Sequence, residues 1–160
     1  MNIFEEEVID LFSLLHKKSV KFILVGGLAV NYYGYSRATG DIDLWIYDET
    51  ENRKKLIEVF KTIGVEGAEA LENMPLIAGF SEILLNNGIY IDLMSELQFF
   101  RKDNFNECYD ISETLMLEED CPVKVLHINK LIEEKEKSKR GKDNEDAVQL
   151  KKIRDLRKKA

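Results

Sequence analysis

The chain has 160 residues, enough for one domain with a sizeable core, and its 44% apolar and 33% charged residues exclude a disordered or collagen-like chain. The net charge of -7 disfavours a protein that coats nucleic acid non-specifically, and no apolar run is long enough to cross a membrane. The acidic N-terminal stretch lacks the basic start of a secretory leader, so a cytoplasmic location is expected.

Helical and strand-like patterns alternate along the chain. Apolar residues at helical spacing predict helices, and short apolar runs bounded by glycine or asparagine predict strands. In chain order they predict a helix over residues 5–17, a strand over 21–25, a short helix over 28–33, a strand over 41–47, a helix over 50–63, two strands over 81–85 and 89–94, a strand over 123–128, and helices over 131–137 and 144–156. The sequence Asn86-Asn87-Gly88 indicates a hairpin turn between the two paired strands.

These elements predict one α+β (α/β) domain over residues 1–160, with a mixed sheet flanked by helices. The core is expected over about 20–128 and a short C-terminal helical tail over about 129–160. From Lys130 onward there are 12 Lys and Arg against 7 Asp and Glu, so the tail carries +5 and the rest of the chain -12. This asymmetry fits either a polyanionic ligand beside the tail or a solvated helix face with mixed charges.

Three aspartates occur within apolar strand patterns. Strand side chains alternate between two faces, so Asp41 and Asp43 project together, about 7 Å apart, from the face opposite Ile42 and Leu44. Asp92 lies in the middle of a later predicted strand. Such carboxylates repel one another unless a cation lies between them, and oxygen ligands without nearby His or Cys favour Mg²⁺, or else Mn²⁺. Exposed acids near a turn would explain an isolated Asp-x-Asp, but the third acid favours a metal site.

The first predicted strand ends in Gly26-Gly27. Backbone amides at the start of the following helix, free of side chains, can approach phosphate oxygens closely. A tight turn without a ligand is the simpler alternative. The pattern is neither a P-loop, which needs a lysine after its glycines, nor a Rossmann fingerprint.

Together these motifs resemble the nucleotidyltransferase superfamily typified by DNA polymerase β. The resemblance lies in Gly26-Gly27 on a strand-to-helix turn, a spacer, Asp41-Ile42-Asp43 on the next strand and Asp92 on a later one. It implies a polymerase-β-like nucleotidyltransferase core that transfers a nucleoside monophosphate from an NTP such as ATP to an acceptor hydroxyl.

A second set of residues is similar to the minimal prokaryotic branch that includes AbiEii-type toxins. These are Arg37 and Thr39 before the acidic strand and, in the tail, Lys135, Lys139-Arg140-Gly141-Lys142-Asp143 and Asp146. The resemblance implies an RNA or protein acceptor in a toxin–antitoxin system, with a possible cognate antitoxin and with neither DNA nor a membrane as partner.

The resemblance also implies roles for individual residues. Asp41, Asp43 and Asp92 would be the catalytic residues and the ligands of two Mg²⁺ ions, and Asp92 would also favour deprotonation of the acceptor hydroxyl. The predicted nucleotide-binding residues are Gly26, Gly27, Arg37, Thr39, Lys135 and Lys142. Structural alternatives remain open for the last four: an ion pair for Arg37, a loop cap for Thr39 and solvated positions for the lysines. Helix capping would suffice to explain Asp143 and Asp146.

Two other functions remain open at this point. One is nucleotidylation of a small molecule, because lincosamide-inactivating enzymes resemble this chain in compact size and in a Gly-Gly, Arg, Asp-x-Asp layout. The other is a non-catalytic nucleotide-binding or antitoxin-like partner protein. The three mutually repelling carboxylates argue against a pure binding protein.

Overall fold

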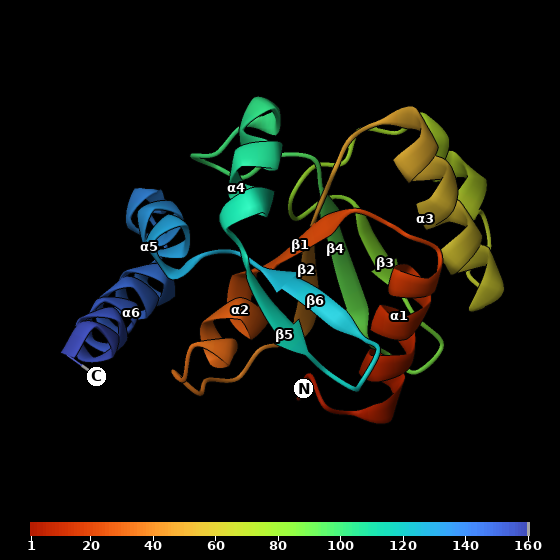
Figure 1. Cartoon of the computed structure of the whole chain (residues 1–160). Coiled ribbons are helices and arrows are strands. Elements are labelled where there is room, and N and C mark those ends of the chain that lie inside the picture. Colours follow the sequence, from red (N-terminus) through yellow and green to blue (C-terminus); the bar gives the residue numbers. More distant parts are fainter. Residues whose placement is uncertain (160) are drawn as a thin grey trace.

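The computed structural model describes residues 1–159, which form a six-stranded sheet in the order β3-β4-β2-β1-β6-β5 (Figure 1). The strands are β1 (Phe22–Val25), β2 (Asp41–Ile46), β3 (Glu82–Leu84), β4 (Tyr90–Met94), β5 (Glu113–Met116) and β6 (Pro122–Val125). The pairs β2–β4 and β1–β6 are parallel, and the other three pairs are antiparallel. The predicted mixed sheet is therefore confirmed, including the hairpin between β3 and β4.

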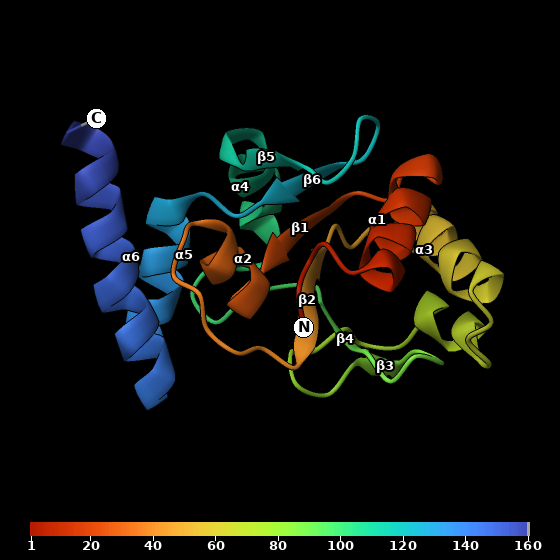
Figure 2. The same ribbon diagram turned by 90° about the horizontal axis from the view of Figure 1, so that it is seen from below.

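Six α-helices surround the sheet. They are α1 (Glu6–Lys17), α2 (Gly26–Tyr32), α3 (Thr50–Thr62), α4 (Phe105–Ile111), α5 (Ile128–Lys137) and α6 (Gly141–Lys159), with short 3-10 turns at Ala68–Glu72 and Lys102–Asn104. In Figures 1 and 2, α1 and α3 lie at one side of the molecule and α5 and α6 at the other. The predicted helical tail is thus the α5–α6 pair.

The two faces of the sheet bury side chains to different extents. Ile42, Leu44 and Ile46 of β2 are fully buried on the core face, as their alternation predicts. The opposite face is covered only in part: Trp45 packs edge-on against Phe105 of α4, with ring centroids 5.2 Å apart. Toward the start of β2 the same face opens, and this is where the acidic side chains lie.

Several element boundaries differ from the prediction. Strand β6 ends at Val125, because His127 caps α5 by accepting a hydrogen bond from the Asn129 amide, so residue 128 is already helical. Helix α2 begins at Gly26 rather than at residue 28. Helix α6 is longer than the predicted 144–156 segment at both ends. Helix α4 and strand β5 were not predicted.

Candidate active site

The structure brings the three predicted aspartates to one face of the sheet. Asp43 of β2 pairs directly with Asp92 of β4 in a parallel register, and Asp41 is two residues before Asp43 on the same strand. Side chains at paired positions of adjacent strands point to the same side of a sheet. All three carboxylates line one cleft of about 490 Å³.

The environment of Asp43 opposes ionisation. Burial, followed by the charges of Asp41 and Asp92, raises the pKa of Asp43 to about 7, although Lys135 and the backbone amide of Gly27 act in the opposite direction. The ionised form of this carboxyl is therefore disfavoured compared with that of an exposed aspartate. A cation between the three groups would remove the repulsion and favour the ionised form.

Asp92 is held by one oxygen and free at the other. The side chain is 5% exposed, and its Oδ2 accepts a hydrogen bond of 2.8 Å from the Gly79 amide. Its Oδ1 is buried and has no hydrogen-bond partner among the described residues. Burial raises the pKa of Asp92, and Glu82 and Asp41 raise it further against the opposing Gly79 hydrogen bond. A buried carboxylate oxygen without a partner is costly unless a ligand binds it.

These features fit a hard divalent cation. No three acidic, His or Cys side chains within residues 1–159 are already gathered tightly enough to form a ready-made metal site. The strands nevertheless place the carboxylates of Asp41, Asp43 and Asp92 on one face, and both the unpartnered Oδ1 of Asp92 and the mutual repulsion that raises the pKa of Asp43 would be relieved by a cation. Oxygen donors alone favour Mg²⁺ or Mn²⁺ over softer metals.

The glycine turn lies against the carboxylates. Gly26 has φ of 68°, a left-handed conformation that favours glycine, and a Cβ at this position would overlap the Asp43 carboxylate. A Cβ on Gly27 would lie 2.6 Å from Thr39 Oγ1 and 3.3 Å from an Arg37 guanidinium nitrogen. The backbone of the turn therefore approaches both the acidic strand and the loop before it, and only glycine permits this.

The loop of residues 34–40 is fixed to the tail by a buried ion-pair network. Arg37 Nε lies 2.8 Å from Asp146 of α6, and Lys135 Nζ of α5 lies 3.0 Å from Asp146 and 2.8 Å from Asp143. Asp146 is completely buried. Burial opposes the ionisation of Asp143, but hydrogen bonds from Lys135 and Ser138 outweigh it and lower the pKa of Asp143. Capping alone thus does not explain Asp143 and Asp146.

The predicted nucleotide-binding residues all line the same cleft, but only some of their side chains already have partners within the protein. Arg37 and Lys135 are engaged with Asp146, while Thr39 donates to the Asp41 carbonyl oxygen at 3.3 Å. Lys142 is exposed at the start of α6 and forms no ion pair with any described residue. Its ammonium group is therefore available to an anionic ligand.

Two residues at the site were not predicted. Asn31 of α2 holds the loop through paired hydrogen bonds with the Arg37 backbone, at 3.0 and 3.1 Å. Glu82 of β3 pairs with Asp92 in an antiparallel register and lines the cleft. Alternation from Asp92 through the hairpin turn would have placed Glu82 on the acidic face, whereas nothing local in the sequence indicates the contact of Asn31.

Comparison with known proteins agrees with this geometry. The mixed sheet flanked by helices is consistent with a nucleotidyltransferase core. A family model described as "Nucleotidyl transferase of unknown function (DUF2204)" matches residues 4–160, so the chain belongs to this family. A search of curated proteins finds no match. None of the described helices is long and apolar enough to cross a membrane.

Proposed function

We propose that the protein is a Mg²⁺-dependent nucleotidyltransferase that moves a nucleoside monophosphate from an NTP to an acceptor hydroxyl. The observation that carries this proposal is the direct pairing of Asp43 with Asp92, whose Oδ1 has no partner among the described residues, beside the glycine turn. A pure binding protein would have no use for this arrangement, because the repulsion costs stability.

Each group of residues has a part in the transfer. An oxygen–phosphorus bond forms between the acceptor and the α-phosphorus, the bond to the bridging oxygen breaks, and pyrophosphate leaves. Asp41, Asp43 and Asp92 would hold the cation, which when bound supplies positive charge to the phosphoryl oxygens and acidifies the acceptor hydroxyl. Asp92 would act as the general base that takes up the hydroxyl proton.

The remaining predicted residues would orient the nucleotide. Gly26 and Gly27 bring the backbone of the turn against Asp43 and Thr39, and both glycines line the same cleft as Lys142, where their backbone would meet the phosphates. Arg37 and Lys135 would act mainly by positioning the loop and the tail, since Asp146 and Asp143 already share their charges. The RNA or protein acceptor and the toxin–antitoxin role implied by the AbiEii resemblance remain predictions.

The proposed activity is tested directly by measuring transfer of label from NTPs that carry it on the α-phosphate. Purified protein is incubated with each NTP, Mg²⁺ and a mixture of RNA, small hydroxyl compounds and cell lysate, in parallel with Asp43→Asn and Asp120→Asn. Asp120 is a matched control because it is exposed in the turn between β5 and β6, outside the cleft. We expect label transfer by wild type and the control but none by Asp43→Asn. Equal transfer by all three proteins would refute the assignment.

A further inference from the structure

The cleft has two chemically different halves. The half beside the β1–α2 turn and the tail carries four cations, and its two acids are already hydrogen-bonded or paired. The cations are Arg37, Lys135, Arg140 and Lys142, and the acids are Glu134 and Asp143. The half beside β4 and β3 carries Glu82 and the backbone of residues 78–79 instead. The carboxylates of Asp41, Asp43 and Asp92 lie between the two halves.

The strand order shows how the two halves of the cleft are arranged across the sheet. From β1 across the sheet, one meets the glycine turn, then Asp43 on β2, then Asp92 on β4 and finally Glu82 on β3. An in-line displacement requires the attacking oxygen and the leaving pyrophosphate on opposite sides of the α-phosphorus. If the proposed function holds, the triphosphate occupies the basic half, and the acceptor approaches from the side of β4 and β3.

Glu82 has no electrostatic partner on this approach. It is exposed, lines the cleft opposite Asp92, and forms no ion pair with any Lys or Arg among residues 1–159. Other acids in the cleft are already satisfied: Glu134 accepts hydrogen bonds from the amides of Gln98 and Phe99 at 2.6 and 2.9 Å, and Asp143 pairs with Lys135. Apart from the three aspartates, Glu82 is therefore the carboxylate of the cleft that has neither an ion pair nor a hydrogen bond among residues 1–159, so it is accessible to a ligand.

Exposed apolar side chains lie close to Glu82 along β3, β4 and the preceding loop, next to the cleft rather than in its lining. Leu84 of β3 pairs with Tyr90 of β4, and Tyr90 pairs with Asp41 of β2, so the three share the face of the catalytic carboxylates. Leu84 and Tyr90 are 54% and 45% exposed. In the adjoining loop Phe80 is 84% exposed, directly after the Gly79 amide that binds Asp92. Large apolar groups gathered beside a reactive centre indicate a binding surface.

We propose that Glu82, Leu84, Tyr90 and Phe80 form the acceptor subsite, and that it takes a small, cationic hydroxyl compound with an apolar or aromatic body. The apolar side chains would cover the body of the acceptor, and Glu82 would bind its positive charge. A polynucleotide acceptor would instead bring phosphates toward Glu82, where like charges repel. The direction of approach rests on the proposed function, whereas the chemistry of the subsite rests on its own residues.

Binding can be tested without catalysis. Amide chemical shifts of the full chain are followed, with Mg²⁺ and a non-hydrolysable ATP analogue present, during titration with three matched probes: phenylethanolamine (cationic), phenylethylene glycol (neutral) and mandelate (anionic). We expect shifts around Gly79, Glu82 and Tyr90, and about three- to tenfold tighter binding of the cation than of the anion. The variant Glu82→Gln should reduce this ratio to about one, and Glu82→Lys should invert it. Glu66→Gln, an exposed acid outside the cleft, should keep the wild-type ratio.

Each result decides one question. Equal binding of the three probes, shifts elsewhere on the molecule, or an unchanged ratio in Glu82→Gln would overturn the acceptor subsite. Tighter binding of a short RNA with a free 3′-hydroxyl at these residues would overturn it in favour of a polynucleotide acceptor. The same probes are then offered as acceptors with labelled NTP. Selective binding of the cation without any label transfer would support the subsite and refute only the proposed reaction.

Discussion

Asp43 is buried beside two other carboxylates, and this makes the stability of the protein sensitive to pH. Its pKa of about 7 in the folded chain exceeds the usual 3.8, so the folded state retains a proton that the unfolded chain loses. The contribution of Asp43 to stability is therefore present at low pH and is lost as pH rises from about 4 to about 7. Above that range the ionised carboxylate destabilises the metal-free fold.

The variant Asp43→Asn should remove this loss. In EDTA we expect its advantage in free energy of unfolding over wild type to grow by about 2 kcal/mol between pH 5 and pH 8. Urea unfolding at both pH values measures the difference, with Asp120→Asn as the control that follows wild type. Saturating Mg²⁺ should stabilise wild type at pH 8 far more than the variant. Parallel pH profiles of wild type and Asp43→Asn would contradict the raised pKa.

Gly26 offers a second test at the scale of one residue. The variant Gly26→Ala places a Cβ on the Asp43 carboxylate and forces a left-handed backbone on alanine, so we expect a loss of about 1 to 3 kcal/mol in stability. It should also lose stabilisation by Mg²⁺ and NTP in thermal unfolding. Gly141→Ala is the matched control, because open space surrounds that glycine at the start of α6, and a change within about 0.5 kcal/mol is expected. Similar losses in the two variants would show that the close approach at Gly26 has no special role.

At the scale of elements, the ion pairs around Asp146 connect the loop before β2 to both tail helices. Removing one partner of a buried pair leaves the other charge uncompensated, which is costly. Asp146→Asn preserves the shape but leaves Arg37 without its pair and Lys135 with Asp143 alone, so we expect a loss of about 3 kcal/mol in the free energy of unfolding. The neighbouring exposed Glu145→Gln should change it by less than about 0.5 kcal/mol.

Chemical denaturation measures the free energy of unfolding of Asp146→Asn and of its control. Limited proteolysis reports whether the loop of residues 34–40 has become more accessible to protease. We expect earlier cleavage of that loop in Asp146→Asn only. A variant as stable and as resistant as wild type would mean that the network does not hold the loop to the tail.

The elements differ in how far local patterns predict them. Helices α1 and α3 have long, regular apolar stripes, so their predicted ranges agree with the structure to within one residue. Helix α4 has only seven residues, too few to display a helical period, and is held by tertiary contacts such as Trp45 with Phe105. Strand β5 is four residues long at the sheet edge, with alternating half-buried and exposed positions. Such short elements depend on what they pack against rather than on their own sequence.

The candidate site shows the same division. Alternation within β2 is a local rule, so the shared face of Asp41 and Asp43 could be predicted. The pairing of Asp43 with Asp92 joins strands far apart in the chain, so alternation could not place it. That the two acids meet was suggested by the apolar setting of all three acids and by the motif resemblance. The partners of Asp146 could not be predicted from capping rules, because α6 begins three residues earlier than expected. Asp146 therefore lies inside the helix rather than at its N-terminus, and its partners come from other elements.

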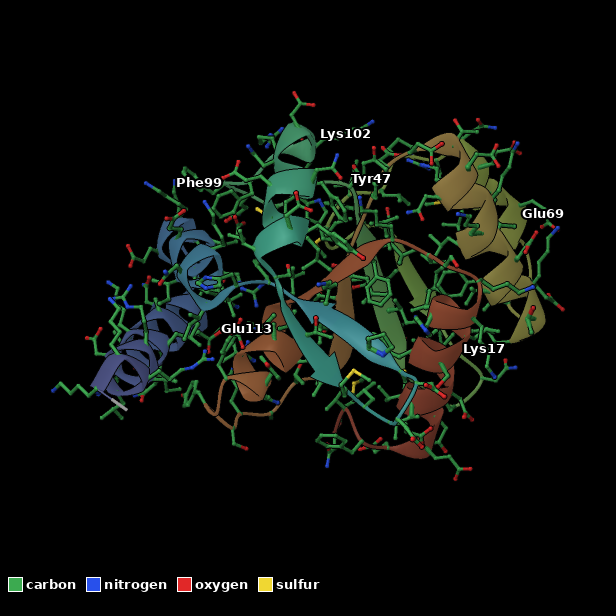
Figure 3. The ribbon with its side chains drawn as sticks, viewed as in Figure 1. Lys17, Tyr47, Glu69, Phe99, Lys102 and Glu113 are labelled. Carbon is green, nitrogen blue, oxygen red and sulfur yellow. The ribbon has the colours of Figure 1, made fainter. Side chains whose placement is uncertain are left out.

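At the scale of the whole molecule, the uneven distribution of charge along the sequence gives the cleft one basic half. The chain before Lys130 carries -12 and would repel an NTP, whereas the segment from Lys130 onward carries +5 and supplies three of the four cations that line the basic half. Figure 2 shows α5 and α6 together at one side of the molecule, and Figure 3 shows Phe99 on that same side, where its ring contacts Lys137. The tail thus gives an acidic protein a local positive field along the basic half of the cleft.

This field predicts a salt dependence that Lys142 should dominate. Lys142 is exposed within the cleft, so Lys142→Gln should weaken Mg²⁺–ATP binding about three- to tenfold at low ionic strength. Lys152→Gln removes the same charge farther along α6, outside the cleft, and should bind nearly as wild type does. Above about 0.5 M salt, screening shortens to a few ångströms, so the affinities of all three proteins should converge. Calorimetric titration over that range measures each slope, and equal slopes for the two variants would show that the tail attracts the nucleotide only through its overall charge.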